Sequence, residues 1–276
     1  MKKILVPTDF SDCARAAEEI AIEMAKKANS EIHFLHLIMT PLEWVKLPKE
    51  KEKNFPEVLA MIGRAKAELG QLKRKAEKLG LKCQIHINFD NGREEIYDHI
   101  KHHNHDFVVM GSHGTKGIRD LIGSNTQKVV RYANIPVLVV KSKIKMNELS
   151  KILFASNFDD QAKSSFRKVI DFASFMGADI MALYVNVPGR FLETDEIESK
   201  MKNFMDDFDN ANCSVHIYDA LSVERGIIKF SERVNSGITA VATHGDRGLF
   251  NLFGSSITEK LVNHSESPVL CLNLEE

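Results

Sequence analysis

Short apolar runs alternate along the chain with stretches in which apolar residues recur every three or four positions. In the first half, strands are expected at 3–7, 32–38, 82–88, 106–111 and 136–140. Helices are expected over 14–28, 56–79, 93–102 and 124–133, with a polar loop over 40–56. This alternation predicts an α/β fold in which helices cover both faces of a parallel, doubly wound sheet.

The second half of the chain repeats the order of the first. Residues 151–158 (Lys-Ile-Leu-Phe-Ala-Ser-Asn-Phe) match residues 3–10 (Lys-Ile-Leu-Val-Pro-Thr-Asp-Phe) in character. A helix is expected from Asp160, and further strands at 180–186, 214–218, 238–242 and 268–273. Self-similarity at this scale indicates a duplicated domain. We expect domains at 1–141 and 151–276, joined by a charged linker at 142–150.

Composition narrows the classes of function. The 276 residues include 37 Lys and Arg against 38 Asp and Glu, so there is no overall basic field to attract nucleic acid. No apolar run reaches the length of a membrane span, and the first residues do not resemble a signal peptide. The four cysteines are widely separated and show no metal or redox spacing. These features predict a cytoplasmic protein with neither nucleic acid nor membrane as partner.

A glycine-rich turn carries the most specific chemistry. The buried run Val108-Val109-Met110 leads into Gly111-Ser112-His113-Gly114, and Gly123-Ser124 then opens a helix. Glycines allow the backbone to approach an anion, and the N–H groups and dipole of a helix start attract negative charge. The residues 240–245 and 254–256 form an altered second copy. The arrangement is typical of phosphate binding.

Each half resembles a universal stress protein domain, so the chain resembles a tandem member of that family. The resemblance spans nearly the whole chain. In the first half it rests on the motifs at 7–11, 110–114, 123–124 and 135–140, together with His36. In the second half it rests on Phe158, the motif at 243–245, Ser256 and the motif at 267–270.

The resemblance implies a five-stranded parallel sheet in each half and an adenine nucleotide, ATP or AMP, at the carboxyl ends of the strands. Mg²⁺ would accompany a bound triphosphate. It also implies that the last strands of the two halves pair antiparallel as an intramolecular pseudo-dimer, and a further homodimer of the whole chain is left open. The residues expected at the nucleotide are Pro7, Thr8, Asp9, Leu37, Met110, Gly111, Gly114, Lys116, Gly123, Ser124 and Asn125.

Departures from the family pattern favour the first half as the nucleotide site. Nucleotide-binding members place nine residues between the second glycine and the Gly-Ser pair, whereas Gly114 and Gly123 enclose eight. The second half has Asn157, Ala242 and Ser255 where binding members have Asp, Gly and Gly. Each of these changes removes a carboxylate acceptor or adds a Cβ where the backbone must approach phosphate. We therefore interpret the second site as degenerate.

Two functions from different classes remain at this point. The first is an adenine-nucleotide-binding regulator or sensor of the stress response. The second is a nucleotide-free structural or interaction module whose glycine turns are relics. Slow ATP hydrolysis is a third reading, but the chain has no P-loop lysine with its following Ser or Thr, and no positioned base.

Several residues have a second interpretation. Asp9 is also suited to cap the first helix. Lys116 either contacts phosphate or is solvated, and Trp44 either covers the site or packs on the sheet edge. The run His102-His103-Asn104-His105-Asp106 contains metal-ligand side chains, but no second ligand pair stands at a recognisable spacing. We expect a solvated helix end there, and neither a metal site nor catalytic residues in the chain.

Overall fold

A computed structural model describes residues 1–40, 44–90, 95–112, 124–208, 212–243 and 255–273. The first half contains β1 (Lys3–Pro7), α1 (Asp12–Ala28), β2 (Glu31–Met39), η1 (Trp44–Lys46), α2 (Lys49–Glu52), α3 (Pro56–Lys78), β3 (Cys83–Asp90), α4 (Glu95–His103), β4 (Phe107–Gly111), α5 (Ser124–Tyr132) and β5 (Val137–Val140). All the strands and helices expected in this half are present. The loop expected over 40–56 also contains the short helical turns η1 and α2.

The second half repeats this order of strands and helices. It contains η2 (Met146–Leu149), β6 (Lys151–Ala155), η3 (Asp160–Ala162), α6 (Lys163–Met176), β7 (Asp179–Asn186), η4 (Pro188–Arg190), α7 (Thr194–Met205), η5 (Asp206–Phe208), β8 (Cys213–Asp219), α8 (Val223–Val234), β9 (Ile238–Thr243), α9 (Ser255–His264) and β10 (Val269–Asn273). The repeated order confirms the tandem α/β fold expected from the sequence.

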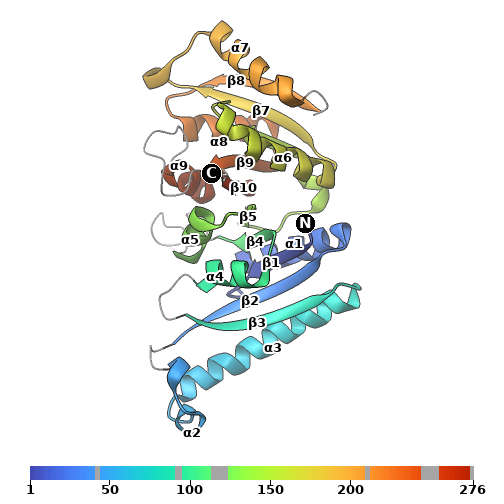
Figure 1. Cartoon of the computed structure of the whole chain (residues 1–276), viewed down its shortest axis with the longest axis vertical. Coiled ribbons are helices and arrows are strands. Elements are labelled where there is room, and N and C mark those ends of the chain that lie inside the picture. Colours follow the sequence, from blue (N-terminus) through green and yellow to red (C-terminus); the bar gives the residue numbers. More distant parts are fainter. Residues whose placement is uncertain (41–43, 91–94, 113–123, 209–211, 244–254, 274–276) are drawn as a thin grey trace.

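A single ten-stranded sheet runs through the molecule in the order β3-β2-β1-β4-β5-β10-β9-β6-β7-β8 (Figure 1). Each half contributes five parallel strands. At the centre β5 and β10 pair antiparallel, with Leu138 opposite Leu270. We call this β5–β10 pair the seam. Each half contributes its last strand to the seam, so these two strands are paired and do not form open sheet edges.

Helices cover the two faces of the sheet in two apolar layers. One layer joins α1, α3, α6 and α7 to side chains such as Ile4, Phe34 and Phe154. The other joins α4, α5, α8 and α9 to side chains such as Leu5 and Val108. Adjacent residues of β1 enter opposite layers because side chains alternate along a strand. Both layers cross the seam, so the halves share one core.

Contacts beside the seam link the halves further. The rings of Phe107 and Phe172 stack 5.5 Å apart, and Lys27 Nζ donates to the carbonyl of Met176 at 2.8 Å. Lys141 Nζ donates to the carbonyls of Asn263 and Ser265 at 2.7 and 2.5 Å. Burial lowers the pKa of Lys141 to about 8.

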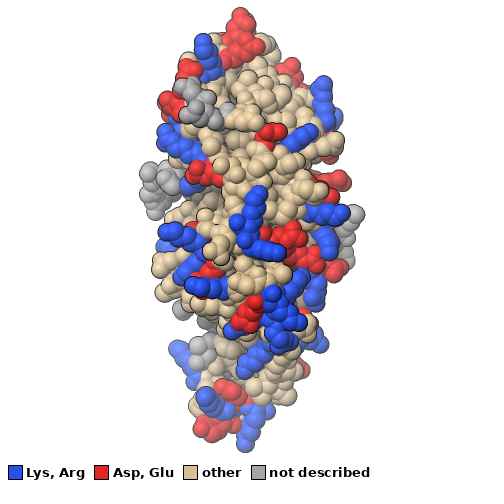
Figure 2. All heavy atoms as spheres, turned by 90° about the vertical axis from the view of Figure 1, so that its right-hand side faces the viewer, with Lys and Arg blue, Asp and Glu red and all other residues tan. Residues whose placement is uncertain are grey.

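The surface view agrees with the balanced composition. Figure 2 shows Lys and Arg side chains interspersed with Asp and Glu along the face drawn. This face therefore carries no extended field of one sign. Among the described helices, none has the length and apolar character needed to cross a membrane.

Candidate functional site

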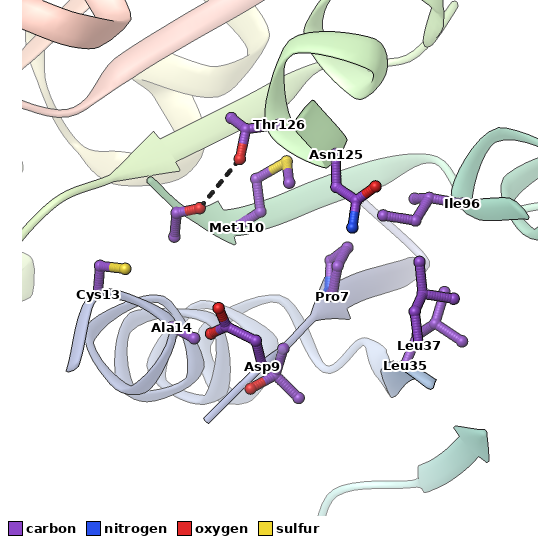
Figure 3. Close-up of a pocket in the computed structure, with 12 residues that line it drawn as sticks. Pro7, Asp9, Cys13, Ala14, Leu35, Leu37, Ile96, Met110, Asn125 and Thr126 are labelled. Atoms are coloured by element: carbon purple, nitrogen blue, oxygen red, sulfur yellow. Dashed lines mark hydrogen bonds between the residues drawn. The ribbon is translucent and has the colours of Figure 1, made fainter. Parts of the chain in front are cut away.

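A pocket of about 190 Å³ opens at the carboxyl ends of β1 and β4 (Figure 3). Figure 3 shows Leu35, Leu37 and Ile96 on one side of it, with Asp9, Cys13 and Ala14 opposite. Five separate parts of the chain converge on one hollow. Its lining residues are Pro7, Thr8, Asp9, Cys13, Ala14, Leu35, Leu37, Ile96, Met110, Gly111, Asn125 and Thr126.

Thr8 is fixed at the end of β1 by four polar contacts. Its N–H donates to the Leu35 carbonyl at 2.8 Å, and Nδ1 of His36 lies 2.7 Å from its carbonyl oxygen. Its hydroxyl donates to Glu18 at 2.5 Å and accepts from the N–H of Phe10 at 3.0 Å. Phe10 has a φ of 63° and stacks on His36 with 4.6 Å between ring centroids. These contacts hold the turn after β1 against β2.

Asp9 is exposed beside this turn. One of its oxygens accepts from the N–H of Ser11 at 3.0 Å and from the Ser11 hydroxyl at 2.5 Å. Ser11 in turn accepts from the N–H of Ala14 at 3.4 Å and is the N-cap of α1. The structure thus makes Ser11 the cap, and the alternative interpretation of Asp9 as the cap is wrong. Asp9 holds the capping residue and lines the pocket.

Gly111 ends β4 directly against the start of α1. A Cβ at this position would lie 2.5 Å from the backbone carbon of Cys13 and 2.6 Å from the backbone nitrogen of Ala14. These separations are far inside van der Waals contact. The missing side chain of Gly111 therefore lets a helix backbone approach the strand, in addition to any role at an anion. The carbonyl of Gly111 also accepts from Thr126 Oγ1 on α5 at 3.3 Å.

The structure brings part of the predicted site together. The residues that line the pocket as expected are Pro7, Thr8, Asp9, Leu37, Met110, Gly111 and Asn125. Gly114, Lys116 and Gly123 lie outside the described residues, and Ser124 is the first residue of α5. Sequence reasoning missed Cys13, Ala14, Leu35, Ile96 and Thr126. Leu35 shares a strand face with Leu37 and was within reach of an alternation argument, whereas the approach of α1 depends on tertiary packing.

Glu18 lies buried behind the pocket, with a side chain that receives the Thr8 hydroxyl. Burial raises the pKa of its carboxyl above the usual range, against the lowering effect of the Thr8 hydrogen bond. The folded protein therefore holds the Glu18 proton more tightly than the unfolded chain does. Above the pKa that Glu18 has in the folded protein, its buried negative charge lowers the free energy of unfolding. This loss diminishes as the pH falls and the carboxyl is protonated.

We expect Glu18→Gln to raise the free energy of unfolding by about 1 kcal/mol at about pH 8. The amide oxygen can still accept from Thr8, while the cost of burying a charge is removed. The gain over the parent protein should shrink as the pH is lowered through the folded pKa of Glu18. Urea denaturation of both proteins across this range measures the difference. A variant that is less stable at every pH would contradict the prediction.

The corresponding strand ends in the second half enclose little space. A hollow of about 10 Å³ is lined there by Ser156, Asn157, Tyr184, Val185, Val187, Arg190 and Val223. By strand register, Tyr184 stands where the first half has His36. Asn157 donates a hydrogen bond to Asp159, and Ala242 takes the place of Gly111. The helix that follows β6 also begins differently, with the 3₁₀ turn η3.

The histidine run differs from the solvated helix end expected from sequence. His102 is exposed, and its Nδ1 lies 2.7 Å from the Asp98 carbonyl oxygen. His105, however, is only 5% exposed, and His103 is half-buried. Both face the sheet, where His33 and His86 lie near them. The expectation is therefore wrong for His103 and His105, since the partner histidines come from strands distant in sequence.

Trp44 packs at the edge of the sheet. Its ring contacts Phe55 and Phe89 at centroid distances of 5.9 and 6.1 Å, and the side chain is buried. It does not line the pocket described above. Of its two interpretations, the structure supports packing.

Comparison with known proteins agrees with this fold. The model of the universal stress protein family matches residues 1–141 and again 148–273. Universal stress protein MJ0531 of Methanocaldococcus jannaschii is 35% identical over 51% of this chain and 82% of its own length. Universal stress protein MJ0577 of the same organism is 32% identical over 51% of this chain and 96% of its own.

A solved structure matches across both halves. The crystal structure of a universal stress protein from Archaeoglobus fulgidus covers 98% of this chain and 98% of its own, with a TM-score of 0.75 and 20% identity. That likeness concerns the fold. The molecule is a tandem α/β protein with a pocket at its strand ends. It belongs to the universal stress protein family, which confirms the resemblance found in the sequence.

Proposed function

We propose that the chain is a stress-response regulator or sensor that binds one adenine nucleotide, ATP or AMP, in the pocket of its first half. The observation that carries the proposal is the pocket itself. Segments around Thr8, Leu37, Gly111 and Asn125 were expected at a nucleotide from sequence, and they line one hollow of about 190 Å³. The second half has about 10 Å³ at the corresponding position.

The chemistry of the lining suits such a ligand. Leu35, Leu37 and Ile96 offer an apolar wall for the face of a base. Asp9 offers a carboxylate oxygen to ribose hydroxyls or to an amino group. The first turn of α5, which contributes Asn125, directs N–H groups and a positive dipole toward a phosphate. Contacts of Gly114, Lys116 and Gly123 with phosphate, and Mg²⁺ beside a triphosphate, stay predictions.

The same proposal assigns a role to each half. Residues 1–141 form the nucleotide-binding domain, 142–150 the linker and 151–276 a degenerate domain that pairs with the first. Pairing of two whole chains stays open, as does a cytoplasmic location. No catalytic role is part of the proposal.

Calorimetric titration of the full chain with ATP and with AMP tests the proposal. We expect one site per chain and a loss of affinity of about 10- to 100-fold in Asp9→Ala, because a hydrogen bond to a charged group contributes about 1.5–3 kcal/mol. Asn157→Ala makes the matched change in the second half and should bind as the parent does. Thermal unfolding checks that both variants fold.

The competing function is a nucleotide-free interaction module of the same fold. It would be favoured if neither nucleotide gave heat and none copurified with the protein. Equal weakening by Asp9→Ala and Asn157→Ala would instead show that binding does not distinguish the halves, which contradicts the assignment of the site.

A further inference from the structure

Five histidines gather on the face of the sheet that α4 covers, and we call them the histidine cluster. They are His33 on β2, His86 on β3, His99 and His103 on α4, and His105 just before β4. Ring centroids of His99 and His103 lie 4.2 Å apart, those of His86 and His99 4.6 Å, and those of His33 and His105 4.7 Å. Imidazole rings are therefore in contact throughout the cluster.

Secondary structure explains how distant positions converge. Parallel pairing sets His33 opposite Gln84 and Leu35 opposite His86, so both histidines share one face of the sheet. His99 and His103 are four residues apart and share one side of α4. Asn104 ends that helix at a φ of 52°, after which His105 enters the same group. Four segments thus contribute imidazoles to one place.

The cluster holds polar atoms without partners. Nε2 of His86, Nε2 of His99 and Nδ1 of His105 are buried and have no hydrogen-bond partner among the described residues. His99 and His105 are each 5% exposed. Each unsatisfied buried group costs about 1–3 kcal/mol. A bound ligand that pairs with these nitrogens would recover that free energy.

The chemistry of the cluster suits metal ions in particular, because imidazole nitrogens are the commonest protein ligands of zinc and related ions. His105 Nε2 lies 3.0 Å from Nδ1 of His33, an outer contact that orients the ring and leaves its Nε2, 3.0 Å from Glu31 Oε1, to coordinate a metal.

The second half shows that the fold does not need four of these five histidines. Strand register matches His33 with Met181 and His86 with His216. The left-handed residues Asn104 and Asn235 end the corresponding helices, which matches His99, His103 and His105 with Phe230, Val234 and Ser236. There Phe230 packs on His216 at 5.2 Å, and Ser236 bonds to Ser231. The same architecture is thus built with an apolar and hydroxyl filling.

We propose that the histidine cluster is a binding site for a divalent transition metal ion, Zn²⁺ in the first instance, with His33, His86 and His103 as ligands. Their ligating nitrogens all lie within 4.8 Å of one another. A tetrahedral zinc site with bonds of about 2.0–2.1 Å brings such nitrogens to about 3.4 Å, so a small closure of side chains completes it. A water molecule is left to take the fourth position, and His105 orients His33 through its Nδ1.

The site is separate from the nucleotide pocket. The pocket uses the carboxyl ends of β1 and β4, whereas His33 lies near the start of β2 and His105 precedes β4. The metal proposal is therefore independent of the nucleotide proposal, and its test is performed with no nucleotide present.

The test is a titration of the chelator-treated full chain with Zn²⁺. Binding is monitored by calorimetry and by the shift in Tm. We expect one tight site per chain, a higher Tm with metal, and, with Co²⁺ as the probe, visible absorption bands of a tetrahedral ion. The test variant combines His33→Met with His103→Val, each taken from the second half so that packing is preserved. It should lose affinity at least about 100-fold. His102→Val changes an exposed histidine of the same helix and should bind as the parent does.

The single variant His103→Gln is a second test variant, because His103 is only half-buried and the change leaves the strands intact. Circular dichroism confirms the fold of each variant before titration. The proposal is overturned if the parent takes up no Zn²⁺. It is also overturned if folded His33→Met/His103→Val or His103→Gln binds the ion as tightly as the parent, which would show adventitious binding at the surface.

Discussion

Gly111→Ala should lower the free energy of unfolding by about 3 kcal/mol and abolish the nucleotide binding proposed above. The added methyl group would lie 2.5–2.7 Å from backbone atoms of Cys13 and Ala14. Backbone atoms of the first turn of α1 cannot move aside as the end of a flexible side chain can, so overpacking here falls at the upper end of its usual cost. Displacement of this turn would also move Cys13 and Ala14, which line the pocket. Urea denaturation and ATP titration measure both effects.

The matched control is Ala242→Gly at the corresponding position of the second half. There the native residue already carries a buried Cβ, so we expect a loss of about 1 kcal/mol or less, mainly from backbone entropy. If Gly111→Ala were as stable as the parent, α1 would not be held against β4 as described. If it unfolded early yet bound ATP normally, the pocket would not depend on this contact.

Leu138→Asp is expected to destabilise the whole chain by about 4 kcal/mol or more, because it buries an unpaired charge at the seam. Leu138 is fully buried, faces Leu270 across the antiparallel pair, and belongs to the layer that crosses between the halves. Both halves should therefore lose stability together. Urea denaturation monitored by circular dichroism measures the loss of stability. Limited proteolysis shows whether both halves become susceptible to cleavage together.

Val215→Asp serves as the control for the seam. Val215 lies on β8, the outer strand of the second half, and is 53% exposed, so its replacement should change stability by at most about 0.5 kcal/mol. A Leu138→Asp protein within about 1 kcal/mol of the parent would contradict a shared core. Unfolding of the first half alone, with the second half intact, would show that the halves are stable independently.

Local patterns were sufficient to predict most of the fold. The strands alternate with amphipathic helices of ordinary length. The near repeat of residues 3–10 at 151–158 indicates the duplication. The pocket residues on β1 and β4 were also within reach, because parallel strands place their carboxyl ends together. The assignment of Pro7, Thr8, Asp9, Leu37 and Asn125 to the site came from the family resemblance.

The remaining parts depend on packing between segments that no local pattern connects. Spacing alone does not show that α1 starts against Gly111, and so Cys13 and Ala14 were missed. The histidine run at the end of α4 was judged by its own neighbours in sequence. His33 and His86 join it only through the register of β2 with β3 and the placement of α4 over that face. Ring contacts of this kind are a tertiary property.

Because both domains lie on one chain, their association across the seam is independent of concentration. Two separate domains joined through the same strands would dissociate on dilution and would carry identical sites. Here residues 142–150 connect β5 to the second half, so each domain meets the other at a fixed effective concentration. Covalent joining thus allows the halves to differ. One can keep an open pocket and an imidazole-rich face while the other serves as its permanent support.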